Sequence, residues 1–225
     1  MKAPPAVLAL FDLDHTLLTI DCDEAWVEFL IEQGVVERTT FEAGNRTIGE
    51  KYRRGEVGLL EFTEFYLSTL ASHPVERLES WREAYLRAKI LPAIPIDSRR
   101  LVAQHVDEGH LCVMTTAASR FLAGPIGEEL GFEHVIATEP EIRDGRFTGK
   151  VAGIPNMRER KIERLETWLA ARERRLEDFR QSWFYSDSRN DIPLLSKVTH
   201  PVAVNPDPTL AALAAGKRWP VLQIG

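Results

Sequence analysis

The feature that most constrains the fold is the alternation of short apolar runs with helical segments. Residues 6–11 (A-V-L-A-L-F) are continuously apolar, which is typical of a strand buried on both faces of a parallel sheet. Further short runs of this kind follow later in the chain, at 111–115, 134–138, 182–186 and 201–204. Strands that alternate with helices form doubly wound parallel sheets, so the sequence predicts an α/β fold with a Rossmann-like core.

Between the first strand and the others, the pattern is helical throughout. Residues 22–90 repeat apolar positions at helical spacing, and we expect about four helices and no strand there. This predicts a core domain made of residues 1–19 and 92–225, with an inserted helical domain at 20–91. In the core we expect helices near 96–108, 119–130, 156–174 and 210–215, a hairpin turning at Asp144-Gly145, and a short final strand in the terminal V-L-Q-I.

Composition excludes several classes of function. Acidic residues (34) outnumber basic ones (28), and no stretch combines clustered Lys and Arg with aromatic residues, so nucleic acid is not expected as a partner. The N-terminal apolar run is too short for a secretion signal, and no run approaches the roughly 20 residues of a membrane-spanning helix. Cys22 and Cys112 stand alone, which argues against a disulfide framework or a cysteine-ligated metal. We expect a cytoplasmic protein that does not bind membranes, and the sequence leaves its oligomeric state open.

Carboxylates follow two of the predicted strands. Asp12 and Asp14 come directly after the first strand, and Asp187 and Asp191 follow the strand at 182–186. Strand residues two apart face the same way, so Asp12 and Asp14 converge on one volume, which Asp187 can join. Clustered carboxylates repel one another unless a hard cation lies between them. The pattern therefore predicts a Mg²⁺ site that binds a phosphate together with a hydroxyl and a lysine.

The residues alone leave the hydroxyl and the basic partner open. Thr115 and Thr116 both end a predicted strand, and periodicity does not choose between them. In the helix that follows residue 156, Arg158 and Lys161 both border the buried stripe, whereas Arg160 points away from it.

Four segments resemble the motifs of the haloacid-dehalogenase-like phosphatases. F-D-L-D-H-T resembles their first motif (DxDxT), V-M-T-T-A-A-S-R-F the second, R-K-I-E-R-L the third and Y-S-D-S-R-N-D-I-P-L-L the fourth. The helical insertion between the first two motifs resembles the helical (C1-type) cap of the group that includes phosphoserine phosphatase. The resemblance implies a Mg²⁺-dependent phosphatase that hydrolyses a small phosphomonoester through an aspartyl-phosphate.

Position by position, the resemblance implies the following roles. Asp12 is the nucleophile, and Asp14 is the general acid and base. Thr116 and Lys161 bind the phosphoryl oxygens. Mg²⁺ is held by Asp12, by Asp187 and by the backbone carbonyl of Asp14, with Asp191 and Asn190 as supporting residues. A phosphotransferase or phosphomutase uses the same residues, and a non-catalytic phospho-ligand binding module is the remaining alternative.

The stretch D-C-D-E-A-W at 21–26 bears on the substrate. Asp21 can cap a helix with Glu24 three residues later, or else Asp21 or Asp23 can receive a cationic group of the substrate. Relatives that cleave phosphoserine carry Glu in place of Asp21 and Ser-Gly-Gly in place of the Thr-Ala-Ala of the second motif. These departures make histidinol phosphate, another amino-alcohol phosphate, a candidate beside phosphoserine by resemblance.

Overall fold

The computed structural model describes residues 6–225; residues 1–5, which we expected to begin the core domain and not a secretion signal, lie outside the described part. Its main feature is a six-stranded, all-parallel sheet with the strand order β3-β2-β1-β6-β7-β8. The strands span Val7–Phe11 (β1), Leu111–Ser119 (β2), His134–Thr138 (β3), Gln181–Ser186 (β6), His200–Val204 (β7) and Val221–Leu222 (β8). The predicted α/β doubly wound fold is confirmed.

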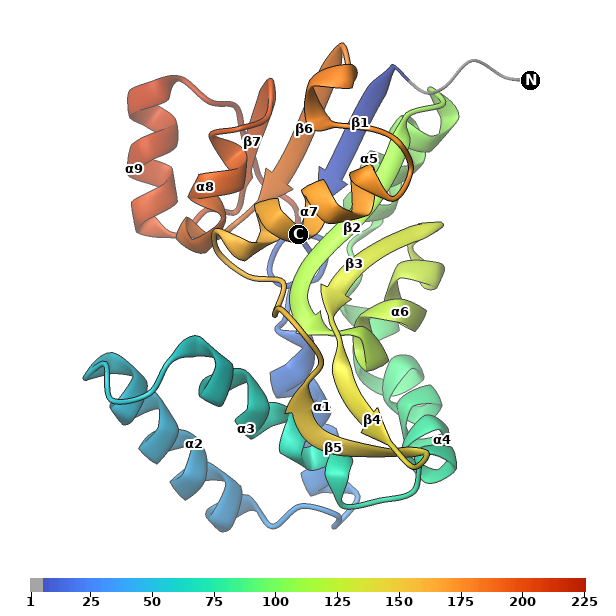
Figure 1. Cartoon of the computed structure of the whole chain (residues 1–225), viewed down its shortest axis with the longest axis vertical. Helices are drawn as coiled ribbons and strands as arrows, with labels where there is room; N and C mark the ends of the chain where they lie inside the picture. The colour runs from blue at the N-terminus through green and yellow to red at the C-terminus, as the bar shows by residue number, and fades with distance from the viewer. Residues whose placement is uncertain (1–5) are drawn as a thin grey trace.

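Both faces of the sheet are covered by helices, as Figure 1 shows. Ala9 and Phe11 pack into one apolar cluster with α5 and α6, while Leu8 and Leu10 pack into a second cluster with α7, α8 and α9. Successive strand residues point to opposite faces, so a strand buried on both sides must be continuously apolar, as 6–11 is. These helices span Ile96–Asp107 (α5), Arg120–Glu129 (α6), Arg160–Ala170 (α7), Ile192–Leu195 (α8) and Pro208–Lys217 (α9).

The order in which strands are added to the sheet changes sides at β1. It runs from β1 to β2 and β3 on one side, and β6, β7 and β8 are then added on the other side of β1. Loops that leave β1 and β6 therefore diverge, and in sheets of this kind ligands bind in the crevice at that switch point. Asp12 follows β1 and Asp187 follows β6, so the two lie at the crevice.

Residues 22–90, between β1 and α5, contain four α-helices and no strand, as predicted. We call α1–α4 the cap; they lie at the end of the molecule toward which the strand arrows point (Figure 1). The cap helices are Cys22–Glu32 (α1), Arg38–Arg53 (α2), Leu59–Ala71 (α3) and Val75–Tyr85 (α4), and α4 continues as a π-helical turn, Leu86–Ile90, and a 3₁₀ turn, Leu91–Ala93.

A β-hairpin packs against the cap. It consists of β4 (Pro140–Arg143) and β5 (Arg146–Val151), and it turns at Asp144-Gly145, where both residues have positive φ. The turn is as predicted, but the packing of the hairpin against α3 was not foreseen: Lys150 Nζ lies 2.8 Å from Glu64 Oε2. Gly149 also has positive φ and lies against Ser68 of α3, where a Cβ atom would approach Ser68 Cα to 3.2 Å.

Several elements differ in length from their predictions; α9 covers 208–217 instead of 210–215, and β8 only the first two residues of the terminal V-L-Q-I. β2 extends four residues beyond 115, because Thr138 and Asn156 hydrogen-bond with its far end. Helix α7 covers 160–170 instead of 156–174, since Arg158 and Glu173 adopt left-handed backbone conformations that interrupt a helix at either end. Among the described helices, none is long and apolar enough to cross a membrane.

Candidate active site

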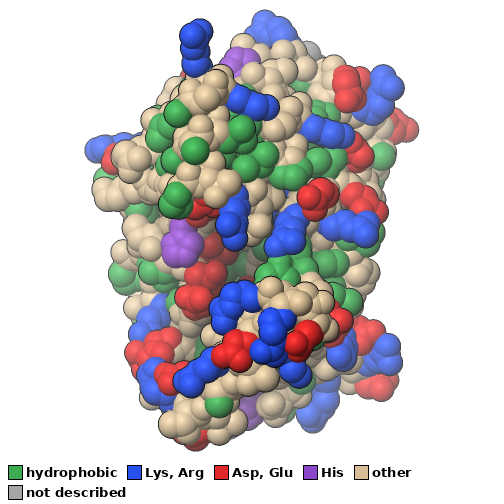
Figure 2. Space-filling view, turned by 90° about the vertical axis from the view of Figure 1, so that its left-hand side faces the viewer, with side chains coloured by type: hydrophobic (Ala, Val, Ile, Leu, Met, Phe, Trp, Pro, Cys, Tyr) green, Lys and Arg blue, Asp and Glu red, His purple; other side chains and the backbone are tan. Residues whose placement is uncertain are grey.

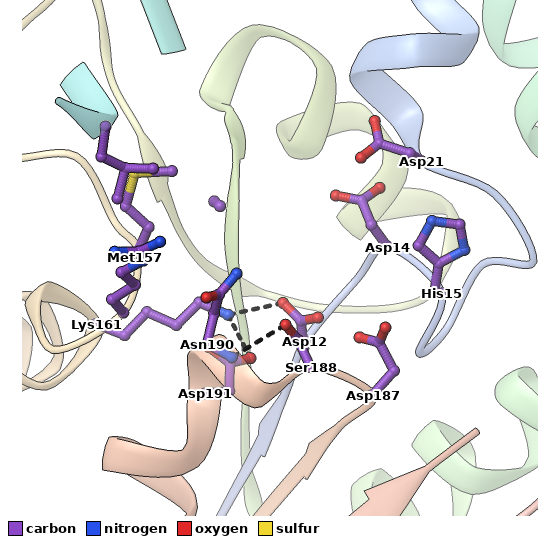
Figure 3. A pocket seen from close by; sticks show the side chains of 13 residues that line it. Asp12, Asp14, His15, Asp21, Met157, Lys161, Asp187, Ser188, Asn190 and Asp191 are labelled. Atoms are coloured by element: carbon purple, nitrogen blue, oxygen red, sulfur yellow. Dashed lines mark hydrogen bonds and ion pairs between the residues drawn. The ribbon is translucent and has the colours of Figure 1, made fainter. Parts of the chain in front are cut away.

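A buried lysine joins two of the carboxylates. Lys161, in the first turn of α7, is 3% exposed, and its Nζ donates to Asp12 Oδ1 at 2.8 Å and to Asp191 Oδ2 at 2.7 Å (Figure 3). Burial lowers the pKa of Lys161, but the charges of the two carboxylates outweigh that effect and the net pKa is raised. The lysine is therefore charged, and it holds Asp12 in one orientation.

Thr16 links Asp12 to Asp187. Its Oγ1 lies 3.3 Å from Asp12 Oδ2 and 3.1 Å from Asp187 Oδ1, and it accepts the backbone N–H of Asp187 at 3.0 Å. Burial raises the pKa of Asp187 to about 6, although the Thr16 hydroxyl opposes the shift. The two carboxylates are thus brought together from β1 and β6, as the strand pattern predicted.

The loop after β1 is a tight turn built around a buried leucine. Leu13 is fully buried, and its carbonyl accepts the N–H groups of Thr16, Leu17 and Leu18. His15, within this turn, has φ +55°, in the left-handed region. Asp12 and Asp14, on either side of this leucine, both line the site.

Asp14 is turned toward the cap. Its Oδ1 accepts the backbone N–H of Cys22 at 2.8 Å. Burial raises the pKa of Asp14 well above its usual value, and the charges of Asp21 and Asp23 add to the shift. Asp14 thus lies close to the nearest cap residues and not to Lys161.

Asp191 is held by a serine as well as by the lysine. Ser186 Oγ, at the end of β6, donates to Asp191 Oδ2 at 2.7 Å. Burial raises the pKa of Asp191 to about 6, against the opposing charge of Lys161. Asn190, beside it, is exposed and lines the site.

The far end of β2 is organised by a buried asparagine that sequence reasoning missed. Asn156 is fully buried, and its Nδ2 lies 3.0 Å from Thr115 Oγ1, 2.9 Å from Thr116 O and 2.9 Å from Ile136 O. Thr116 Oγ1 accepts the N–H of Ala118 at 3.1 Å. Thr116 is fully buried, and the β2 residue that lines the site is Ala117.

The three basic residues at or just before the start of α7, Arg158, Arg160 and Lys161, differ in exposure and in the groups they contact. Arg160 is exposed, as predicted from its position away from the buried side of the helix, and it pairs with Glu163 at 2.6 Å. Arg158 is also exposed; it lines the site, and its guanidinium donates to the hydroxyl of Tyr52 on α2. Only Lys161 of these three residues contacts Asp12.

Asp21 is the N-cap of α1. Its Oδ1 accepts the N–H of Glu24 at 2.9 Å, which confirms the capping interpretation for one of its two oxygens. The residue also lines the cavity, and Figure 3 shows its carboxylate beside that of Asp14. Asp23, two residues later, is half-exposed and lines an adjoining cavity.

Two adjoining cavities meet at this site. The first cavity is lined by Asp12, Lys161, Asp187 and Asp191, among others, and the second extends from it toward the cap. Figure 2 shows acidic side chains in the hollow between the upper and lower parts of the molecule, with basic side chains along its edges.

The carboxylates around the first cavity outnumber the cations that contact them. Within residues 6–225, no group of three or more His, Cys, Asp or Glu side chains is arranged as a metal site. The Asp14 side chain is engaged by Cys22, so only the Asp12 and Asp187 carboxylates converge there as side-chain donors. Two carboxylates and a backbone carbonyl suit Mg²⁺, which retains waters and uses few protein ligands.

Three supporting residues were absent from the predicted site. Thr16 and Ser186 both lie inside the segments that signalled the site, F-D-L-D-H-T and Y-S-D-S, so a closer interpretation of those segments could have included them. Asn156 had no comparable signal, because a single asparagine at the start of a predicted helix is ordinarily a cap or turn residue.

Comparisons with known proteins agree with this geometry. The family model of haloacid dehalogenase-like hydrolases matches residues 9–196. The chain is 39% identical to a histidinol-phosphatase of Neisseria meningitidis serogroup C (strain 8013), over 96% of this chain and 97% of that protein. A crystal structure of a protein of unknown function from Bordetella pertussis Tohama I superposes with a TM-score of 0.93 at 42% identity, covering 97% of this chain and 99% of that one. A substrate-bound phosphoserine phosphatase superposes with a TM-score of 0.65 at 20% identity, covering 98% and 94%.

Proposed function

We propose that this chain, which belongs to the haloacid dehalogenase-like hydrolase family, is a phosphatase that hydrolyses a small phosphomonoester through a phosphorylated aspartate. The observation that carries the proposal is the convergence of Asp12, Asp187 and the charged Lys161 at the switch point of the sheet. That arrangement combines a carboxylate nucleophile with a fixed positive charge for phosphoryl oxygens.

In the first step Asp12 attacks phosphorus, and its oxygen replaces the oxygen of the alcohol. One Asp12 oxygen faces Lys161 and the other faces Thr16, and these contacts support a fixed orientation for in-line attack. Asp14 gives a proton to the departing alcohol oxygen. Its position on the cap side of the nucleophile supports this role, because the alcohol part of the ester must extend away from Lys161.

In the second step water attacks the phosphorus of the phosphorylated Asp12. Asp14, now ionised, accepts the proton of that water, and phosphate leaves with the original carboxylate restored. Lys161, held by Asp191, neutralises phosphoryl oxygens in both steps. Thr116 is the hydroxyl proposed for those oxygens; because its side chain is fully buried and does not line the first cavity, this contact requires the side chain to rotate toward the phosphate.

Mg²⁺ is the cofactor that the donor set suits. Asp12 and Asp187 would hold it, with the backbone carbonyl of Asp14, while Asp191 and Asn190 support the surroundings. When bound, it would offset the carboxylate charge and neutralise the phosphoryl group.

The substrate is the phosphate ester of a small amino alcohol, and histidinol phosphate and phosphoserine are the first two to test. The relative named histidinol-phosphatase covers nearly the whole chain, whereas the likeness to phosphoserine phosphatase supports the fold alone. Asp21 and Asp23 are the contacts proposed for a cationic group, since both line the space beyond Asp14.

Phosphate release from a panel of phosphomonoesters, with Mg²⁺ and with EDTA, tests the proposal. We expect activity that EDTA abolishes and Mg²⁺ restores, and none in Asp12→Asn. Asp97→Asn, at an exposed position on α5, is the matched control and should retain activity.

Mass spectrometry of quenched reactions should detect one phosphoryl group on the wild-type chain and none on Asp12→Asn. Activity that survives Asp12→Asn would exclude the covalent mechanism. Phosphate that appears on an added alcohol instead of in water would favour the phosphotransferase, and no turnover of any ester would favour a binding module.

A further inference from the structure

One lysine and one arginine line the first cavity, and only the lysine is already paired with carboxylates. Among the residues that the structure describes, Lys161 and Arg158 are the Lys and Arg side chains on its walls. Lys161 donates to the carboxylates of Asp12 and Asp191, so its charge is shared between two anions before any substrate enters. Arg158 forms no ion pair within residues 6–225. The positive charge that an entering phosphate meets without a carboxylate partner is therefore that of Arg158.

A phosphomonoester brings more negative charge to this cavity than Lys161 can offset. Its phosphate is close to a dianion at neutral pH, and the carboxylates of Asp12, Asp187 and Asp191 line the same space. Like charges at this range oppose binding. A guanidinium on the cavity wall is suited to reduce that repulsion, because its planar fork donates paired hydrogen bonds to the oxygens of a phosphate.

Arg158 lies at the boundary between the two cavities. It lines both of them, whereas Arg189 lines the second cavity only. Its backbone is left-handed, with φ +51°, and its carbonyl accepts the N–H of Lys161 at 3.1 Å, so the two basic side chains leave the same turn. An ester whose phosphate lies against Asp12 and whose alcohol extends into the second cavity crosses this boundary. Arg158 therefore lies beside the ester linkage, while Lys161 lies beside the nucleophile.

A tyrosine of the cap holds the guanidinium in place. The hydroxyl of Tyr52, on α2, accepts a hydrogen bond from Arg158 Nη2, and the guanidinium carbon lies 5.6 Å from the centroid of the tyrosine ring. The Tyr52 ring is in turn 5.5 Å from the ring of Phe62 on α3. A long side chain that is held in one place loses less conformational entropy when it binds a ligand. The contact uses one terminal nitrogen of Arg158, so its other N–H groups remain for phosphate oxygens.

We propose that Arg158 is a further phosphate-binding residue of this site, which donates paired hydrogen bonds to the non-bridging oxygens of the substrate, and that Tyr52 of the cap positions it. This inference rests on the proposed function and adds two residues to that site. Arg158 makes the same contact with the phosphate of the ester and with the phosphate released. Its loss therefore weakens the binding of both, and it changes KM more than kcat.

Isothermal titration calorimetry with inorganic phosphate in the presence of Mg²⁺ measures the binding directly, and hydrolysis of p-nitrophenyl phosphate gives kcat and KM. In Arg158→Ala we expect the Kd for phosphate and the KM to rise about tenfold each, with kcat changed by less than about threefold. Arg158→Lys should lose only about threefold in Kd, because an ammonium group keeps the charge but not the fork. Tyr52→Phe should weaken phosphate binding about twofold, since the arginine stays but its hydroxyl partner is lost.

Arg160→Ala is the matched control. Arg160 lies two residues from Arg158, pairs with Glu163 and lines neither cavity, so its replacement should leave Kd and KM unchanged. Added salt should weaken phosphate binding less in Arg158→Ala than in Arg160→Ala, because one cation fewer contacts the anion.

Equal Kd values for phosphate in Arg158→Ala and Arg160→Ala would overturn the inference. A loss in Tyr52→Phe as large as that in Arg158→Ala would also overturn it, because the arginine would then act only by holding the cap to the core. The inference and the proposed function fail separately. A wild type that binds phosphate through Arg158 but cleaves no ester would contradict the proposed function alone.

Discussion

Replacing Asn156 by alanine tests whether the buried amide holds the far end of β2. Its Nδ2 contacts one hydroxyl and two strand carbonyls, and its backbone N–H donates to Thr138 Oγ1 at 3.0 Å. Thr138 Oγ1 in turn donates to Ala117 O at 2.8 Å. The substitution removes the side-chain contacts but keeps the backbone one, so it isolates the contribution of the amide.

The expected loss of stability follows from the two side-chain amide protons of Asn156, each of which can donate a hydrogen bond. Each hydrogen bond contributes about 0.5–1.5 kcal/mol net, and leaving a buried strand carbonyl unpaired costs about 1–3 kcal/mol. Asn156 Oδ1 has no partner in the described structure, so its removal offsets part of this loss. We expect the free energy of unfolding to fall by about 3 kcal/mol, which lowers Tm by about 6–12 °C for a chain of this size.

Urea unfolding followed by circular dichroism measures the change, with scanning calorimetry for Tm. Asn45→Ala is the control, because Asn45 is half-exposed and accepts only a 3.3 Å contact from Tyr66; it should change stability by less than about 0.5 kcal/mol. Asn156→Asp should destabilise more than alanine, since it points a carboxylate at the carbonyls of Thr116 and Ile136. An Asn156→Ala protein as stable as the Asn45→Ala control would refute the reasoning.

Three further predictions concern other buried polar groups. Tyr85→Phe should lower the unfolding free energy by about 1–2 kcal/mol in urea titrations, because the fully buried hydroxyl donates at 2.7 Å to a backbone carbonyl of α1. Burial lowers the pKa of His105 to about 4, so the folded protein stays neutral there while the unfolded chain takes up a proton below about pH 6.5. The stability that His105 contributes is therefore complete above pH 6.5 and is lost as the pH falls toward 4, by about 1–2 kcal/mol at pH 5; unfolding titrations should show a shallower pH dependence in His105→Gln. Asp191→Asn should lower kcat about tenfold in phosphate-release assays. Without the Asp191 carboxylate, Lys161 interacts electrostatically with Asp12 alone, and this stronger interaction weakens Asp12 as a nucleophile. An unchanged kcat would remove Asp191 from the supporting residues.

Much of the fold followed from periodicity alone. A strand buried on both faces must be apolar at every position, and residues 7–11 satisfy that rule wherever the neighbouring strands lie. The hairpin turn followed from Asp144-Gly145, because few residue pairs adopt positive φ at both positions. The lengths of β2 and α7 were less predictable, since contacts from Thr138 and Asn156 extend β2, and left-handed backbone at Arg158 and Glu173 limits α7.

The sequence by itself determined which carboxylates meet. Asp187 joins Asp12 because parallel strands end at the same edge of a sheet. This rule holds before any packing is known. Asp14 lines the same cavity, but it lies in the turn after β1 and faces the cap, which strand alternation did not predict.

Only the tertiary structure decided which basic side chain contacts Asp12. Arg158 and Lys161 share a helical stripe in the sequence, but the left-handed backbone at Arg158 starts α7 late and directs Lys161 inward. Contacts between distant segments depend on the shapes of both surfaces at once, and no periodicity within one segment records them.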